Sequence, residues 1–250
     1  MRCPAKATPC QTIGFEPVAA EFEKLRHKTT EHTRYFPYFV GDGTTRAFHE
    51  CSFSATSSLF EPNTALLAKF QNLEELVRAV KTYPVETKRL DDIPEVTGTD
   101  FLKVDVQGAE LLVFRGGERM LNDVLVVQTE VEFVPLYKDQ PLFAEVDMFL
   151  RGRGLQFHRM SWSGRTFKPL IVNNDAYAAM SQMLWGDAVY VRDFMTFDRL
   201  APLALLKLAC IVHECYGSYD LAALALSAYD AQTGARLHPA YVERLTKPSG

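Results

Sequence analysis

The segment that most constrains the fold is DFLKVDVQGAELLVFRGG, residues 100–117. An apolar run at 101–106 is typical of a buried strand, and it ends close to Gly108. Residues 109–115 follow with helical spacing and stop at a pair of glycines, a common helix end. A strand that passes through a glycine directly into a helix indicates a layered α/β fold.

Two charged residues interrupt this apolar run. Lys103 and Asp105 are two positions apart, so they face the same side of a strand. A buried charge needs a partner or a ligand, and we expect Lys103 to pair with Glu130 or Glu132 of a neighbouring strand. We expect Asp105 to face a cleft, because ligands bind at the carboxyl ends of strands in parallel sheets. Glu110 fits equally well as a helix N-terminal charge or as a functional residue.

The rest of the chain also alternates between strands and helices, which predicts a mainly parallel sheet. From residue 198 the pattern changes to two apolar helices joined at Gly217-Ser218, expected to form a hairpin by core packing. We predict an α/β domain at 1–197 and a helical extension at 198–250. The predicted strands and helices are a strand ending at Glu16, a strand and hairpin partner around the GDG turn in 35–53, a helix in 64–81, a strand in 123–133, a helix in 141–154, and late strands at 155–162 and 187–194.

Composition excludes several classes of protein. The net charge of −4 gives no basic field for nucleic acid. Five cysteines without a CxxC pair argue against disulfides or zinc, so we expect a reducing, cytoplasmic setting and no metal centre. The most apolar stretch, 200–212, is too short to cross a bilayer, and the N-terminus lacks a signal-peptide core. We expect neither nucleic acid nor membrane as a partner.

A series of motifs, spread over about residues 13–195, resembles the FkbM family of S-adenosylmethionine-dependent methyltransferases. In chain order they are IGFEP, PYFVGDG, SSLFEPN, RLDD, FLKVDVQGAELLVFRGG, VVQTEVEFVPLY and WGDAVYVRD. The resemblance implies the class I methyltransferase fold, which has a Rossmann-like sheet. It also implies S-adenosylmethionine as cofactor and methyl transfer as the reaction.

The same resemblance assigns roles to individual residues. Glu16 would hydrogen-bond the ribose hydroxyls of the cofactor, since a carboxylate accepts two such bonds. Asp42 would lie beside the adenine, although an ordinary turn aspartate explains it equally well. Asp105 would lie near the methionine part and the methyl acceptor. The predicted cofactor-binding residues are Phe15, Glu16, Pro17, Gly41, Asp42 and Asp105.

The expected reaction is O-methylation of a hydroxyl on a small metabolite or sugar. Its proton needs a base, and we expect Asp105 or Glu130, with His49 and His158 as alternatives. Ser57–Ser58 either lines the acceptor pocket or belongs to a solvated loop. Most of the catalysis would come from holding the two reactants in line.

One feature departs from the family pattern. The family begins with a strand and a glycine-rich D-x-G-A-N-x-G turn, whereas only MRCPAKATPCQT precedes IGFEP here. Either the true start lies upstream or the chain is a degenerate copy, and the retained carboxylates favour the first. We expect an upstream-extended chain to bind the cofactor and the present chain to bind it weakly or not at all.

Two other functions compete with this one. A non-catalytic, methyltransferase-like binding or partner protein would keep the fold without the cofactor. A dinucleotide-dependent oxidoreductase could also use Glu16 on a ribose, but no GxGxxG precedes that residue.

Overall fold

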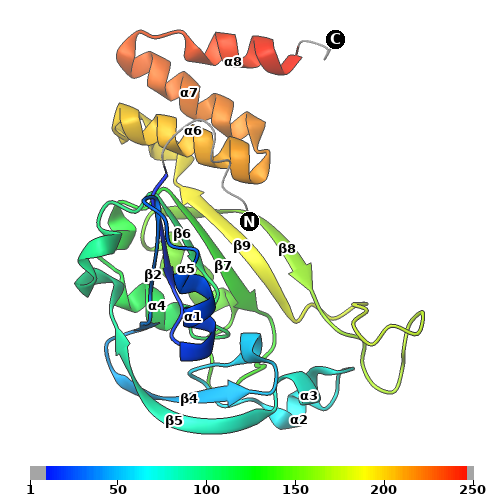
Figure 1. Ribbon diagram of the computed structural model, residues 1–250. Helices are drawn as coiled ribbons and strands as arrows, with labels where there is room; N and C mark the ends of the chain where they lie inside the picture. The colour runs from blue at the N-terminus through cyan, green and yellow to red at the C-terminus, as the bar shows by residue number, and fades with distance from the viewer. Residues whose placement is uncertain (1–9, 247–250) are drawn as a thin grey trace.

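The computed structural model describes residues 10–246 and shows a mixed α/β architecture (Figure 1). Its largest sheet has the strand order β6–β7–β9–β8. β6 and β7 are parallel, whereas β9 runs antiparallel to both of its neighbours, so the sheet is mixed rather than mainly parallel. These strands are β6 (Phe101–Val104), β7 (Val126–Glu132), β8 (Leu155–Ser163) and β9 (Trp185–Arg192).

Two smaller sheets precede the large one along the chain. β1 (Thr12–Phe15) pairs in parallel with β2 (Thr33–Phe36). β5 (Ala79–Lys88) lies between β3 (Phe39–Val40) and β4 (Thr45–Cys51), parallel to the first and antiparallel to the second.

Two predictions in this region are wrong. β3 and β4 do not form a hairpin across the GDG turn, because each pairs with a different edge of β5. The helix expected at 64–81 is reduced to α2 (Thr64–Leu67) and α3 (Leu73–Leu76). Asn72, with a φ of 59°, interrupts the helical path between them, and the chain enters β5 after α3.

Helices cover both faces of the large sheet. On one face, Val127 and Val131 of β7 pack in a core with Phe114 of α4 (Glu110–Gly116) and Leu150 of α5 (Phe143–Arg151). On the other face, Val126 and Val191 pack in a core with α6 and α7. The other helices are α1 (Ala19–Arg26), α6 (Pro202–Tyr216), α7 (Tyr219–Thr233) and α8 (Leu237–Thr246), with 3-10 turns at Ser54–Thr56, Leu90–Asp92, Pro94–Val96, Met120–Asn122 and Phe194–Arg199.

The C-terminal helices follow one another closely. α6 ends at Gly217, whose φ of 60° is left-handed, and its N–H donates to the His213 carbonyl at 3.0 Å. α7 begins two residues later and packs against α6 through Leu221 and Ala222. Figure 1 shows these helices stacked at one end of the sheet.

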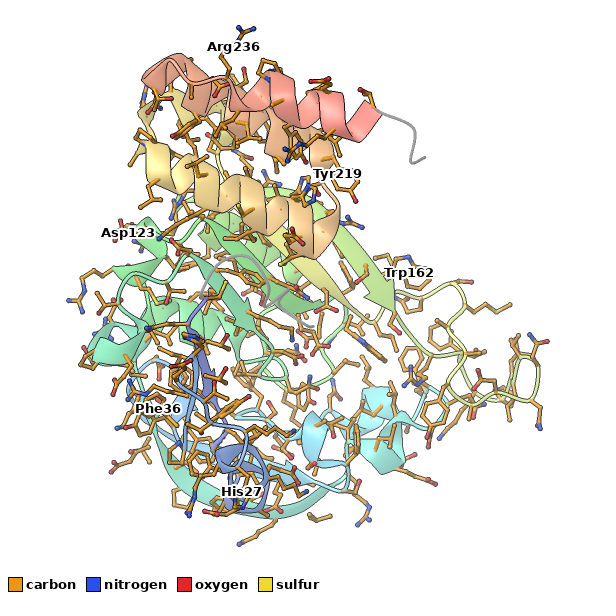
Figure 2. The ribbon with its side chains drawn as sticks, turned by 45° about the horizontal axis from the view of Figure 1, so that its top comes forward. His27, Phe36, Asp123, Trp162, Tyr219 and Arg236 are labelled. Atoms are coloured by element: carbon orange, nitrogen blue, oxygen red, sulfur yellow. The ribbon has the colours of Figure 1, made fainter. Side chains whose placement is uncertain are left out.

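Figure 2 shows the same arrangement with its side chains. Tyr219, the first residue of α7, and Arg236, just before α8, are labelled on the C-terminal helices, and His27, just after α1, is labelled on the opposite side of the view. No helix within residues 10–246 combines the length and the apolar character that a bilayer-spanning segment needs.

The end of α4 fits tightly against the chain after β3. A Cβ atom built on Gly116 would overlap with the carbonyl oxygen of Gly41. One of the two glycines that end the predicted helix is therefore required by close backbone contact, because any side chain would separate α4 from β3 and β5.

We predict that Gly116→Ala lowers the free energy of unfolding by about 2 kcal/mol or more, because a methyl group there overpacks a backbone contact. Gly152 is the matched control, since it also ends a helix but has a right-handed φ of −62° and its nearest neighbour is a carbonyl 3.3 Å away. Gly152→Ala should change stability by less than about 1 kcal/mol. Urea unfolding of both variants measures the difference, and equal midpoints would contradict the packing argument.

Candidate functional site

The parallel pairing of β6 and β7 brings two predicted residues together. Val104 pairs with Thr129, so the following residues, Asp105 and Glu130, lie side by side near the carboxyl ends of the strands. The amide of Gln107 joins them, because its Nε2 donates to Asp105 Oδ1 at 3.0 Å and to Glu130 Oε2 at 2.6 Å. The two expected catalytic carboxylates therefore share one hydrogen-bond donor group.

Gln107 was given no role by the sequence, yet it lies at the centre of this network. Its φ of 56° is left-handed, which is uncommon outside glycine and asparagine and is often found at functional sites. Its backbone carbonyl accepts from the Ser58 hydroxyl at 2.6 Å, and its Oε1 accepts from the Tyr137 hydroxyl at 3.2 Å. The only sequence signal was a polar residue directly before Gly108 at the strand-to-helix crossing.

The prediction for Lys103 is wrong. Its Nζ lies 3.1 Å from Asp105 Oδ2, and within the described part of the chain it pairs with neither Glu130 nor Glu132. The reason is local: residues two apart on a strand face the same side, and a lysine stem reaches its own neighbour more easily than the next strand. Lys103 and Asp105 are each 41% exposed, so this pair sits at the water-accessible edge of the site.

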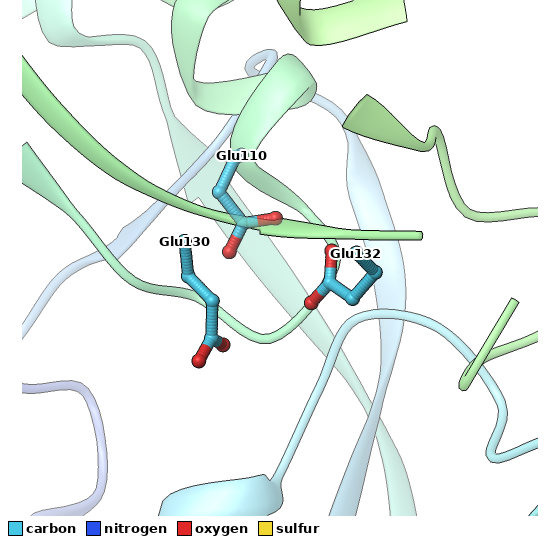
Figure 3. Close-up of side chains that lie close together, drawn as sticks. All are labelled: Glu110, Glu130 and Glu132. Carbon is cyan, nitrogen blue, oxygen red and sulfur yellow. The ribbon is translucent and has the colours of Figure 1, made fainter. Parts of the chain in front are cut away.

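Three glutamates form a cluster beside Asp105, as Figure 3 shows for Glu110, Glu130 and Glu132. Each contributes a carboxylate oxygen within 4.8 Å of the other two. Among residues 10–246, no other group of three or more histidine, cysteine or acidic side chains has this spacing, which a cation could bridge.

Glu110 already has a structural partner in this cluster. It is 2% exposed, and its Oε1 accepts from the backbone N–H of Val106 at 2.8 Å and of Gly108 at 3.3 Å. These bonds hold the loop that carries Gln107. Glu110 is therefore more than a surface charge at a helix N-terminus.

Burial determines the protonation of the cluster. It raises the pKa of Glu130 to about 8 and that of Glu110 to about 7, and the pKa of Glu132 also rises well above its usual range. The charge of Asp105 raises all three further. At neutral pH these groups therefore retain protons instead of carrying three full negative charges.

The second predicted part of the site lies on β1. Glu16 follows this strand, and its Oε1 accepts from the Val18 N–H at 2.9 Å; among residues 10–246, no hydrogen bond engages its other oxygen. Phe15 stacks with Tyr38, with ring centroids 6.2 Å apart, and Pro17 leads into α1. Within the described residues, no hydrogen bond or ion pair joins Glu16 to Asp105, although Phe15 packs against the same core as Val104.

The structure does not bring Asp42 to Asp105. Gly41 contacts the last residue of α4, whereas Asp105 precedes the loop that leads into the first residue, Glu110, so the two lie toward opposite ends of this helix. Both oxygens of Asp42 are engaged, because Thr44 donates its hydroxyl at 2.7 Å and Arg46 donates Nη2 at 2.5 Å. These donors hold the pKa of Asp42 well below its usual range. The alternative role, that of an ordinary turn aspartate, accounts for these hydrogen bonds of Asp42.

The two histidines expected as alternative bases and the two serines expected at the acceptor pocket make contacts that stabilise the fold. His49 Nδ1 is 3.2 Å from Thr82 Oγ1, and His158 Nε2 is 2.8 Å from Ser218 Oγ at the α6–α7 junction. Burial lowers the pKa of both histidines. Neither contacts Asp105 or Glu130. The Ser57 hydroxyl accepts from the Cys51 N–H, and the Ser58 hydroxyl donates to the Gln107 carbonyl. Both serines therefore stabilise loops.

These features define an α/β protein with a carboxylate-rich site at the ends of two parallel strands. The sequence model of the Methyltransferase FkbM domain matches residues 3–157, more than half of the chain. The chain therefore belongs to the FkbM methyltransferase family. Comparison with curated proteins and comparison with solved structures each found no match.

We predict that stability falls as pH rises through the pKa of Glu130. The folded protein binds more protons than the unfolded chain between the ordinary glutamate pKa of 4.5 and about 8, so raising the pH favours unfolding. Each such carboxyl contributes a slope of up to about 1.4 kcal/mol per pH unit. The neighbouring charges are Asp105, Glu110 and Asp187, which raise this pKa, and Lys103, which lowers it.

Glu130→Gln removes one ionisation while keeping the size of the side chain. We expect its melting temperature to equal that of the parent protein near pH 4.5 and to exceed it at pH 8. The matched control is the exposed Glu21→Gln on α1, which should leave the pH profile unchanged. If the melting temperature changes with pH in the same way in the parent protein and in Glu130→Gln, the raised pKa of Glu130 is wrong.

Proposed function

We propose that this protein is an S-adenosylmethionine-dependent methyltransferase that acts in the cytoplasm on a hydroxyl group of a small metabolite or sugar. The observation that carries the proposal is the pair of carboxylates, Asp105 and Glu130, joined by Gln107 at the ends of parallel strands in an FkbM-family chain. The sheet order β6–β7–β9–β8 would then be one half of a Rossmann-like sheet.

The acidic strand ends suit a cofactor that carries positive charge. The sulfonium and amino groups of S-adenosylmethionine would be attracted to Asp105, whose partner Lys103 is partly exposed to water, and would favour ionisation of the glutamates around it. The free oxygen of Glu16 would accept from a ribose hydroxyl, with Phe15 and Pro17 beside it. Gly41 and Asp42 remain a family-based prediction for the adenine side.

S-adenosylmethionine would supply the methyl group: the acceptor oxygen would bond to its methyl carbon while the bond from that carbon to sulfur breaks and its electron pair stays on sulfur. Asp105 or Glu130 would accept the hydroxyl proton. Gln107 keeps both carboxylates in place for this transfer, so the site mainly positions the reactants.

We predict that an upstream-extended chain binds S-adenosylhomocysteine in isothermal titration calorimetry more tightly than the 250-residue chain does. Glu16→Gln should weaken binding about tenfold or more, because hydrogen bonds to a charged acceptor contribute about 1.5–3 kcal/mol. Asp105→Asn should weaken binding of the cationic S-adenosylmethionine more than that of the neutral sulfur product. Glu21→Gln, with an exposed glutamate paired to Lys24, serves as the control with unchanged affinity.

Failure of the upstream-extended protein to bind either compound would contradict the proposal and favour a non-catalytic binding protein. Equal binding by Glu16→Gln would instead show that the ribose lies elsewhere.

A further inference from the structure

A row of polar residues crosses the face of the large sheet that adjoins Glu130. Glu130 on β7 pairs with Asp187 on β9, which pairs with Ser161 on β8. Gln128 and Arg159 occupy the next row on the same face, because alternate strand residues point to the same side. The face therefore continues outward from the carboxylate pair instead of ending there.

The last turn of α6 covers part of this face and leaves a cavity of about 200 Å³. Its floor includes Gln128, Asp187 and Ser161, and its wall includes Cys215 and Tyr216. The volume is below the range of about 300–1,000 Å³ that is usual for drug-sized ligands, so the cavity suits one small ring.

Hydrogen bonds fix the polar groups of this cavity. The Tyr216 hydroxyl donates to Gln128 Oε1 at 3.0 Å, and Gln128 Nε2 donates to Asp187 Oδ1 at 3.2 Å. Arg159 Nη1 donates to the Tyr216 carbonyl at 2.8 Å, which ties β8 to the end of α6. Within residues 10–246, Asp187 Oδ2 and the Ser161 hydroxyl have no hydrogen-bond partner, so both are available to a ligand.

We infer that this cavity is the binding site for the methyl acceptor, and that the acceptor is a neutral, polyhydroxylated ring such as a glycoside. The inference rests on the proposed function. A sugar hydroxyl can donate to Asp187 and accept from Arg159, and Ser161 serves in either role. An anionic acceptor would be repelled by the Asp187 carboxylate, which lines the cavity.

The geometry also connects the cavity to the proton acceptor. Side chains directly opposite one another on antiparallel strands have Cβ atoms about 4.5–5.5 Å apart, so a hydroxyl held by Asp187 is within reach of Glu130. Asp105 or Glu130 would accept the proton of that hydroxyl during methyl transfer. Asp187, which lines the cavity and pairs with Glu130, thus connects the cavity to the carboxylate pair.

The position of these residues in the chain supports a role in specificity. The family match ends at residue 157, and Arg159, Ser161, Asp187, Cys215 and Tyr216 all lie beyond it. The residues proposed to bind the cofactor therefore lie in the segment that matches the family, and most residues of the cavity lie outside it.

Saturation-transfer difference NMR tests the inference with a panel of methyl glycosides: methyl α-D-glucopyranoside, methyl α-D-mannopyranoside and methyl α-L-rhamnopyranoside. Spectra are recorded with and without S-adenosylhomocysteine. We expect at least one glycoside to bind the protein, and Asp187→Asn to weaken its binding about tenfold. Asp175→Asn, in the loop between β8 and β9, should bind it normally.

Ser161→Leu provides a second variant that fills the cavity without removing a hydrogen bond. Its control is Ser163→Leu, on the same strand and face but outside the cavity. The inference is supported if Ser161→Leu abolishes glycoside binding while Ser163→Leu preserves it, with calorimetric affinity for S-adenosylhomocysteine unchanged in both. Undiminished glycoside binding by Ser161→Leu, or no binding by the parent protein, overturns it.

Cavity-dependent glycoside binding without S-adenosylhomocysteine binding would contradict the methyltransferase proposal while still supporting a sugar site. The experiment can therefore contradict the sugar-site inference and the methyltransferase proposal independently.

Discussion

Several carboxyl groups share the edge where β6 and β7 end, and the structure depends on how their repulsion is limited. Backbone N–H groups hold Glu110, and Lys103 pairs with Asp105. The amide of Gln107 joins Asp105 to Glu130 from a left-handed backbone conformation. Without these donors, ionisation of more than one of these carboxyl groups would repel the loop from the strand that it follows.

This arrangement explains which parts of the site could be predicted from sequence. Asp105 and Glu130 were predictable because strand periodicity and parallel order place them side by side. Gln107 was not, because its importance depends on a positive φ that only the folded loop reveals. The Lys103 prediction failed because sequence shows that a partner is needed but not which neighbour lies nearer.

Some parts of the fold could likewise be predicted from sequence and others could not. The unit from β6 to α4 matches the prediction closely, because its apolar run, glycine and helical spacing all agree locally. The β4–β5 region does not, since the helix predicted at 64–81 runs into the first residues of β5, which pair with β4 instead. The tight contact between Gly41 and Gly116 also lies beyond any local pattern, because it joins segments far apart in the chain.

Protonation of the glutamate cluster fits a cationic cofactor better than a permanent negative charge would. Burial raises the pKa of Glu110 to about 7 and that of Glu130 to about 8, so near neutral pH Glu130 is mostly protonated and Glu110 is partly protonated. A nearby sulfonium would stabilise their ionised forms and lower these pKa values. Glu130 would then become a better proton acceptor at the moment when the methyl donor is bound, and the protein without its cofactor would avoid the cost of several buried charges.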